Sequence, residues 1–542
     1  MQYQKALAFA LSSLTLASSA SLAAKAPAQL ATATPIKHLV VIYSENVSFD
    51  HYFATYPKAT NPKGEPVFIA AKNTPAVNNL ASAGLLANNP NSTNPANGKQ
   101  AADPFRLDRS QAATADQNHA YTAEQLAYNG GKADLFPKYT GRASAGAIGA
   151  FGTRGQVMGY YDGNTVTALW HYAQRFAMSD NAFTDTYGPS TPGALEAVSG
   201  QTNGLQLVKS SEHSYYIKDG QGGYTMINDV DPATDVCSSK TDQGWMTGKN
   251  IGDLLNSQQI SWGSFMGGFD LSAHNANGTQ GCQRSTYSAV VHRTVTDYIP
   301  HHAWFQYYRS TANPGHVRPA SVAAIGHSYL ADGKTPEPAN HEYDLKDFFA
   351  ALKAGNFPAV SYIKAPAYQD GHAGYSDPLD EQAFITKVVN AVQQQPGWQN
   401  TAIIVAWDDS DGWYDHAFAK TLHASYDAAD RLNGQGTCGH GSAPAGVQGK
   451  PVNGRCGPGT RVPFLLISPY AKVNYVSHQP ITQSSIVRFI EDNWLNGQRL
   501  GGGSFDASAG SITNMFDFKH PHPQPLYLDS QSGEPLHGPH HS

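Results

Sequence analysis

The sequence predicts an α/β fold, a three-layer sandwich with a mostly parallel central sheet. Short apolar runs alternate with segments that carry helical signals along the 542 residues. Two of the apolar runs, 37–43 and 401–407, are followed directly by acidic side chains. A hydrophobic content of 40% is sufficient to bury a large core. Because there is neither an internal repeat nor a clean linker, we expect one domain with loop insertions over residues 27–520.

The N-terminal segment has the pattern of a secretory signal peptide. Lys5 precedes an apolar stretch, 6–16, and small residues continue to Ala26. The stretch is too short for a stable membrane anchor, and no later run is long enough to span a bilayer. We therefore expect residues 1–26 to be a signal peptide and the protein to be exported to the periplasm or the extracellular space.

Charge and composition limit the possible partners. The formal net charge of −6 leaves no basic surface for nucleic acid, so we expect no nucleic-acid partner. The C-terminal residues 521–542 are rich in histidine and poor in apolar side chains. A disordered tail is the expectation there, with metal binding as the alternative.

Four cysteines, an even number, favour disulfides in an exported chain. Their order suggests the pairs Cys237–Cys282 and Cys438–Cys456, each closing an insertion rich in Gly, Ser and Asn. A zinc site is the alternative, but no C-x-x-C spacing supports it.

The predicted elements follow in order along the chain. The first strand is 37–43, and segment 58–104, rich in Asn, Ala, Pro and Gly, indicates an excursion from the core. The other predicted elements are helices at 122–128, 166–176, 348–355, 380–394 and 482–495, a helix start after the Gly-Pro turn within 183–204, and strands at 359–363, 401–407 and 461–468.

Metal-type ligands follow two of these strands. Glu45 and Asn46 come after the first strand, and Asp408 and Asp409 come after the strand 401–407. Ligands in open α/β sheets gather outside the carboxyl ends of the strands. Since oxygen ligands suit hard cations, we expect one divalent ion here, with Ca²⁺, Mg²⁺ or Mn²⁺ favoured and Zn²⁺ or Fe left open. The alternative is that both strand ends are solvated turns.

A candidate nucleophile lies in the stretch Tyr187-Gly-Pro-Ser-Thr-Pro-Gly193. Thr191 and Pro192 fit an N-cap and a first helical position, which would put Ser190 just ahead of a helix. Backbone N–H groups there favour an anion, and a hydroxyl beside a cation can attack phosphorus. The alternative is that Ser190 only shapes a turn. No G-x-S-x-G motif is present in this stretch, which argues against an α/β-hydrolase triad.

Three histidines in polar and aromatic contexts, His119, His302 and His372, are candidates to bind phosphoryl oxygens and to protonate a leaving group. His372 is the strongest candidate because nearby glycines, Gly371 and Gly374, indicate a loop that approaches another group closely. With 22 histidines in the chain, a structural role is the alternative for each of them.

Four motifs together resemble the bacterial phosphoesterase family of secreted acid phosphatases, of the respiratory-burst-inhibiting type, and phospholipases C. In chain order, these motifs lie at 45–53, 188–190, 300–302 and 407–409. The resemblance runs from about residue 37 to residue 495. It implies a fold similar to alkaline phosphatase.

The resemblance also implies roles for individual residues. It places the metal between Glu45, Asn46, Asp408 and Asp409, makes Ser190 the nucleophile, and puts Asn46, His119, His302 and His372 around the phosphate. Spacing does not separate His302 from its neighbour His301.

Two activities follow from this resemblance. Phospholipase C members often carry threonine at the nucleophile position, whereas this chain has Ser190. We therefore expect an acid phosphatase that acts on small phosphate esters through a phosphoserine; the alternative is a phospholipase C that cleaves at phospholipid head groups. The sequence does not indicate an oligomeric state.

Three other functions are less consistent with the motifs. A sulfatase needs S-x-P-x-R or C-x-P-x-R, and Ala194 stands where the arginine is required after Ser190. A glycosidase also uses paired carboxylates, but adjacent aspartates at one strand end are poorly placed on either side of a sugar. A non-enzymatic binding protein on a decayed scaffold predicts losses among the ligands, and none is lost.

Overall fold

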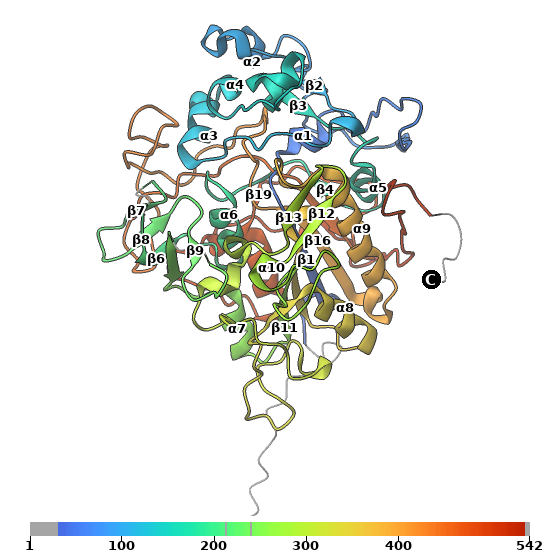
Figure 1. The fold of residues 1–542 in the computed structure, drawn as a ribbon, viewed down its shortest axis with the longest axis vertical. Coiled ribbons are helices and arrows are strands. Elements are labelled where there is room, and N and C mark those ends of the chain that lie inside the picture. The colour runs from blue at the N-terminus through green and yellow to red at the C-terminus, as the bar shows by residue number, and fades with distance from the viewer. Residues whose placement is uncertain (1–30, 212–213, 239–240, 537–542) are drawn as a thin grey trace, which may run out of the picture.

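A computed structural model, which describes residues 31–211, 214–238 and 241–536, has an eight-stranded sheet at its centre (Figure 1). The strand order is β14-β11-β15-β1-β16-β17-β4-β18. β17 is antiparallel to both neighbours, and the other pairings of this sheet are parallel. In chain order, these strands are β1 (His38–Ser44), β4 (Ala177–Ser179), β11 (Trp262–Met266), β14 (Glu342–Asp344), β15 (Val360–Lys364), β16 (Thr401–Trp407), β17 (Phe464–Ile467) and β18 (Tyr475–Ser477).

The sheet has β1 near its middle, between β15 and β16. β-branched and other apolar residues fill these strands almost without interruption, as expected for a sheet covered on both faces. The register aligns Ile42 with Ile363 and Ser44 with Trp407. The carboxyl ends of all three strands therefore lie at the same edge.

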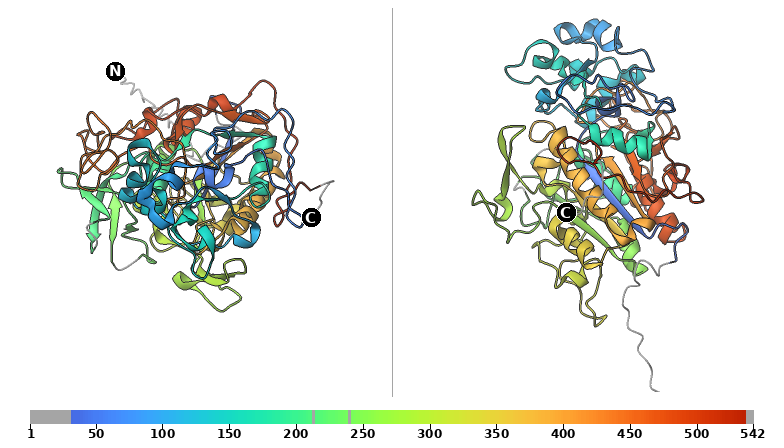
Figure 2. Two further views of the ribbon diagram at one scale, coloured as in Figure 1. Left: turned by 90° about the horizontal axis from the view of Figure 1, so that it is seen from above. Right: turned by 90° about the vertical axis from the view of Figure 1, so that its right-hand side faces the viewer.

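Helices cover both faces of the sheet. On one face, α9 (Pro378–Gln393) packs against α5 (Thr167–Arg175) and α8 (Leu345–Ala354). On the other, α6 (Ser190–Ser199) packs against α7 (Ile251–Ser257) and α10 (Ser484–Trp494). Figure 2 shows α8 and α9 on the opposite side of β1 from α10. The predicted three-layer α/β sandwich is confirmed.

Two smaller units surround the sandwich. A five-stranded sheet has the order β7-β8-β6-β10-β9, and short helices form a cap at the top of Figure 1. The five strands are β6 (Asn203–Lys209), β7 (Tyr216–Lys218), β8 (Tyr224–Met226), β9 (Asp231–Pro232) and β10 (Gln243–Met246). The cap contains α2 (Pro90–Thr93), α3 (Tyr121–Tyr128) and α4 (Phe136–Tyr139). Segment 58–104 contributes α2 to this cap, and its Phe68 packs edge-on against Trp170.

The start of α6 corrects one expectation. The helix begins at Ser190, with Pro189 at the N-cap, so Thr191 is not the cap. Pro189 has a φ of −81° and extended backbone, which supplies the non-helical residue that a cap requires. Ser190 is therefore inside the first helical turn instead of ahead of it.

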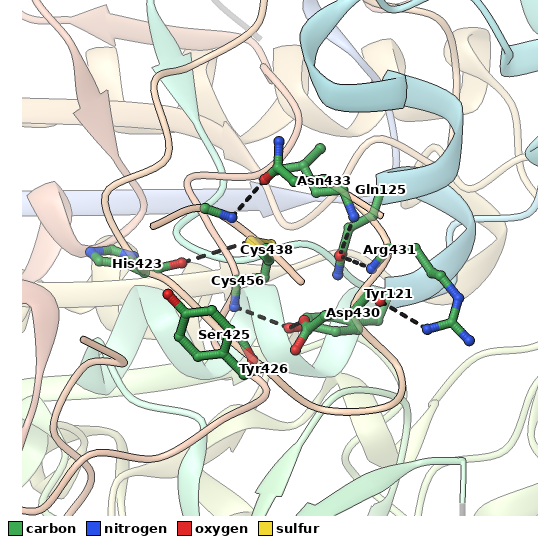
Figure 3. The surroundings of a disulfide bond; sticks show 12 residues. Tyr121, Gln125, His423, Ser425, Tyr426, Asp430, Arg431, Asn433, Cys438 and Cys456 are labelled. Carbon is green, nitrogen blue, oxygen red and sulfur yellow. Dashed lines mark hydrogen bonds between the residues drawn. A yellow bond between two sulfur atoms is a disulfide. The ribbon is translucent and has the colours of Figure 1, made fainter. Parts of the chain in front are cut away.

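Both predicted disulfides form, between Cys237 and Cys282 and between Cys438 and Cys456. The second one closes part of a long loop, and hydrogen bonds hold this loop against α3 (Figure 3). There the backbone N–H of Cys456 donates to Tyr121 Oη, and that hydroxyl donates to Asp430 Oδ1. This tie matters because α3 begins two residues after His119.

The expectation of a disordered tail is wrong for residues 521–536. Trp398 Nε1 donates to the carbonyl oxygen of Pro523, and Asn390 Nδ2 donates to that of Leu528, whose side chain is fully buried. Hydrogen bonds to side chains near α9 thus hold a segment that has few apolar residues. Residues 537–542 and the predicted signal peptide, 1–26, lie outside the described residues. Within the described part of the chain, no helix is both long and apolar enough to span a membrane.

Candidate active site

The carboxyl ends of β1 and β16 bring together the four residues predicted as metal ligands. Glu45, Asn46, Asp408 and Asp409 are each no more than 1% exposed. Asn46 has a φ of 41°, a left-handed conformation that asparagine tolerates better than most residues. The four side chains form a buried cluster of oxygen atoms.

The amide of Asn46 lies at the centre of this oxygen cluster. Its inward end is 2.6 Å from Glu45 Oε2, 2.9 Å from Asp408 Oδ1 and 3.2 Å from Asp409 Oδ2. As placed, this end is Oδ1, which accepts a hydrogen bond from Ser190 Oγ at 3.3 Å. Rotating the amide would put Nδ2 there as a donor to the carboxylates.

A cation among these oxygens would instead favour Oδ1 facing inward. Bonds of roughly 2.1 to 2.4 Å to a hard cation place neighbouring ligand oxygens about 3 Å apart. The spacing around Asn46 is close to that value. The four residues therefore fit a divalent ion, in both donor type and spacing.

Ser190 reaches the oxygen cluster from the first turn of α6. Its Oγ donates to Glu45 Oε2 at 2.9 Å and lies 3.2 Å from Asp409 Oδ2. Gly193 permits this approach, because a Cβ there would lie 2.0 Å from the carbonyl oxygen of Asp408. The N–H groups at a helix start favour an anion, so the hydroxyl, the acidic ligands and a positive helix end converge here.

His302 lies against the oxygen cluster and its neighbour His301 does not. His302 Nδ1 is 3.2 Å from Glu45 Oε1, and its side chain is 4% exposed. His301 Nδ1 faces Asp231 at 3.5 Å, and 30% of its side chain is exposed. The structure thus separates two histidines that spacing alone left equivalent.

His119 and His372 lie beside each other at the same site. Their ring centroids are 5.6 Å apart in an edge-to-face arrangement. His372 Nε2 is 3.0 Å from the outer end of the Asn46 amide, and His119 Nδ1 is 3.0 Å from Asp411 Oδ1. All three predicted histidines therefore surround the region next to Ser190.

Burial and neighbouring charges divide these histidines into two kinds. Burial lowers the pKa of His372 to about 4, assisted by the nearby His119. Burial likewise lowers the pKa of His302 well below its usual value. For His119, burial lowers the pKa, but neighbouring carboxylates, Asp409 first, outweigh it and raise the pKa well above 6.5. These directions favour the protonated form of His119 and the uncharged forms of His302 and His372.

The pKa values of the two aspartates are both raised. Burial raises the pKa of Asp408 well above its usual value, and the charge of Glu45 raises it further. Burial also raises the pKa of Asp409, which His119 lowers and Asp408 raises. Buried carboxylates in mutual contact stay ionised when a bound cation compensates their negative charge. The raised pKa values therefore agree with the donor geometry in indicating a cation site.

The sequence analysis missed three charged residues at this site, Lys364, Asp370 and Asp411. Lys364 Nζ donates to Glu45 Oε1 and lies 3.5 Å from Asp408 Oδ2. It is the last residue of β15, so its place at a strand's carboxyl end was an available signal. Asp370 and Asp411 lie in loops, and no local pattern distinguishes them from other loop aspartates.

A cavity of about 560 Å³ opens at the start of α3. The lining of this cavity includes Ala120, next to His119, and Asn228, next to Asp229. Asp229 in turn accepts a hydrogen bond from the backbone N–H of Thr191. The lining is mixed, with polar or charged side chains such as Lys218 and Asp427 and apolar ones such as Ile217 and Ile227. None of the residues that line this cavity belongs to the predicted site.

Comparison with known proteins identifies relatives of this chain. The chain is 24% identical over 510 residues to a non-hemolytic phospholipase C of Pseudomonas aeruginosa, covering 91% of this chain and 58% of that protein. It is 22% identical over 501 residues to phospholipase C A of Mycobacterium tuberculosis, covering 90% of this chain and 78% of that protein. The chain thus spans less than two thirds of the Pseudomonas relative.

Among solved structures, a protein of the alkaline phosphatase superfamily from Vibrio parahaemolyticus is similar with a TM-score of 0.29 and 10% identity, covering 71% of this chain and 78% of that one. The model of the Phosphoesterase family matches residues 36–495, which include both strand ends, Ser190 and the three histidines. This chain belongs to the Phosphoesterase family.

Proposed function

We propose that this protein is a metal-dependent hydrolase of phosphate monoesters and that Ser190 is its nucleophile. The observation that carries this proposal is the position of Ser190 Oγ, within 3.3 Å of oxygens from Glu45, Asn46 and Asp409 at the start of a helix. The neighbouring hydroxyl of Thr191 instead donates to the carbonyl oxygen of His301 at 3.3 Å. This contact supports Ser190 as the attacking residue.

The reaction has two steps. Ser190 Oγ forms a bond to phosphorus while the bond to the leaving alcohol breaks, and water then hydrolyses the phosphoserine. A divalent ion held by Glu45, Asn46, Asp408 and Asp409 would stabilise the deprotonated hydroxyl and offset the charge of the phosphoryl oxygens.

The histidines have separate tasks in this mechanism. In the uncharged ring of His302 the N–H lies at Nδ1, which faces Glu45 Oε1, and in that of His372 it lies at Nδ1, which faces the Ala373 carbonyl oxygen. Each ring therefore donates Nε2–H to a phosphoryl oxygen only as the imidazolium, which a bound phosphate dianion stabilises. His119 donates a proton to the leaving alcohol, because its pairing with Asp411 through Nδ1 stabilises the imidazolium and leaves Nε2 as the donor.

The test is the variant Ser190→Ala, with Ser199→Ala, at the other end of the same helix, as the matched control. Loss of the attacking atom should lower kcat at least about a thousandfold, or about 4 kcal/mol in activation free energy, while the control keeps its rate. Rapid quenching of the wild type should trap a phosphoryl group on Ser190, detected by peptide mass spectrometry. Near wild-type turnover by a folded Ser190→Ala protein would overturn the assignment and point to Thr191.

A second candidate function is that of a phospholipase C, because relatives at 22–24% identity bear that name. Comparing p-nitrophenyl phosphate with p-nitrophenyl phosphorylcholine and phosphatidylcholine vesicles separates the two. Faster turnover of either phosphodiester would favour the phospholipase.

A further inference from the structure

A buried lysine lies on the side of the oxygen cluster away from Ser190's hydroxyl. Lys364 is 1% exposed, and its ammonium group donates to Glu45 Oε1. The same group is 3.5 Å from Asp408 Oδ2, which has no hydrogen-bond partner. The rings of Tyr43 and Trp304 lie 6.0 and 5.9 Å from it. A lysine buried in such surroundings requires the carboxylates as partners.

Each of two carboxylates directs one oxygen toward this ammonium group and the other toward the Ser190 side of the oxygen cluster. Glu45 turns Oε2 toward Ser190 and Oε1 toward Lys364. Asp408 turns Oδ1 toward Asn46 and Oδ2 toward Lys364. A carboxylate that gives one oxygen to each of two cations is the arrangement of a two-metal site, in which the ions lie about 3.5 to 4 Å apart.

Without the ammonium group of Lys364, the residues around it would suit a metal ion. Oxygen or nitrogen atoms of Glu45, His302 and Asp370 all lie within 4.8 Å of one another, and all three residues are buried. His302 Nδ1 and Lys364 Nζ both contact the same oxygen, Glu45 Oε1. The negative charge of Asp370 also helps to raise the pKa of the Lys364 ammonium group.

We propose that the ammonium group of Lys364 occupies the position of a second cation, so that the site takes one divalent ion instead of two. Lys364 is then a positioning residue: it fixes Glu45 and Asp408 with their other oxygens toward Ser190 and excludes a metal from the group Glu45, His302 and Asp370. This inference rests on the metal site of the proposed function.

The experiment measures zinc bound per chain, by equilibrium dialysis followed by elemental mass spectrometry. Wild type should retain one zinc ion, and Lys364→Met, which keeps the length of the side chain without its charge, should retain two. Lys364→Arg keeps a cation and should retain one. Lys346→Met is the matched control, since that lysine pairs with Asp270 outside the active site, and it should also retain one.

Adding His302→Asn to Lys364→Met should bring the count back to one, which would locate the second ion. Two tightly held ions in the wild type would overturn the inference, and this measurement does not depend on how well any variant folds. One ion in a Lys364→Met protein with a wild-type circular dichroism spectrum would also overturn it, while the proposed function would stand. No ion in the wild type would instead refute the metal site of the proposed function.

Discussion

Removing the bound cation with a chelator is expected to lower the melting temperature of the protein together with its activity. The cation-free site holds the carboxylates of Glu45, Asp408 and Asp409 in a buried cluster, with Lys364 as the cation in contact with two of them. Burial and then the neighbouring negative charges raise the pKa of Asp408 and Asp409, which favours proton uptake by the cation-free site. The metal-bound protein avoids this proton uptake.

The size of the effect follows from linkage. An ion at a free concentration a thousandfold above its Kd stabilises the folded state by about 4 kcal/mol. An unfolding entropy of about 2.1 cal/mol/K per residue gives roughly 1 kcal/mol/K for about 500 residues. Removing the ion should therefore lower the melting temperature by roughly 4 °C. Asp408→Asn or Asp409→Asn should weaken metal retention at least about tenfold, since even outer partners of metal ligands have effects of that order.

Differential scanning calorimetry before and after dialysis against a chelator, with elemental analysis of both samples, provides the measurement. Adding back the ion should restore both the melting temperature and the activity. Asp332→Asn is the control, because that aspartate caps an exposed turn at Thr335. Full activity in a protein without stoichiometric metal would refute the reasoning and leave the histidines as the only catalytic groups.

Three further perturbations test the scaffold. Replacing Cys438 and Cys456 with serine opens a loop of 18 residues and should cost about 3 kcal/mol in unfolding free energy, measured by calorimetry. Burial raises the pKa of Glu381 to about 8 in the folded state, from 4.5 in the unfolded state. Between these two pH values, Glu381 is therefore protonated only in the folded state. Stability should thus fall by up to about 5 kcal/mol as pH rises from 4.5 to 8, and Glu381→Gln should reduce this fall in urea titrations. Arg461→Met leaves buried Asp415 without its ion pair and should cost about 3 to 5 kcal/mol; an unchanged urea midpoint would contradict this.

Much of the scaffold could be predicted because its signals are local. The strand 401–407 matches β16 at both ends, and the first strand differs from β1 by one residue at each end. Continuous apolar runs mark strands that are buried on both faces, so they are visible without knowledge of the neighbours. The edge strands β14 and β18 were missed because they have only three residues each, too few for a pattern.

The same difference between local and long-range signals decides which parts of the candidate site could be predicted. Glu45 and Asp408 could be placed together because parallel strands bring their carboxyl ends to one edge. Lys364 follows the same rule but was overlooked, since a lysine at a strand end is usually solvated. Its burial depends on acidic partners far away in the sequence.

Three features could be predicted without the fold: the α/β layers, the two disulfide pairs and the family-specific set of metal-type ligands. Each of these depends on residue type and on order along the chain. Three other features became visible only in the folded chain: His302 and not His301 faces Glu45, α6 begins at Ser190, and residues 521–536 are held near α9. These features depend on side-chain direction and on close approach between distant segments. Gly193 is the clearest case: its missing side chain lets α6 meet the end of β16, a contact that exists only once both are folded.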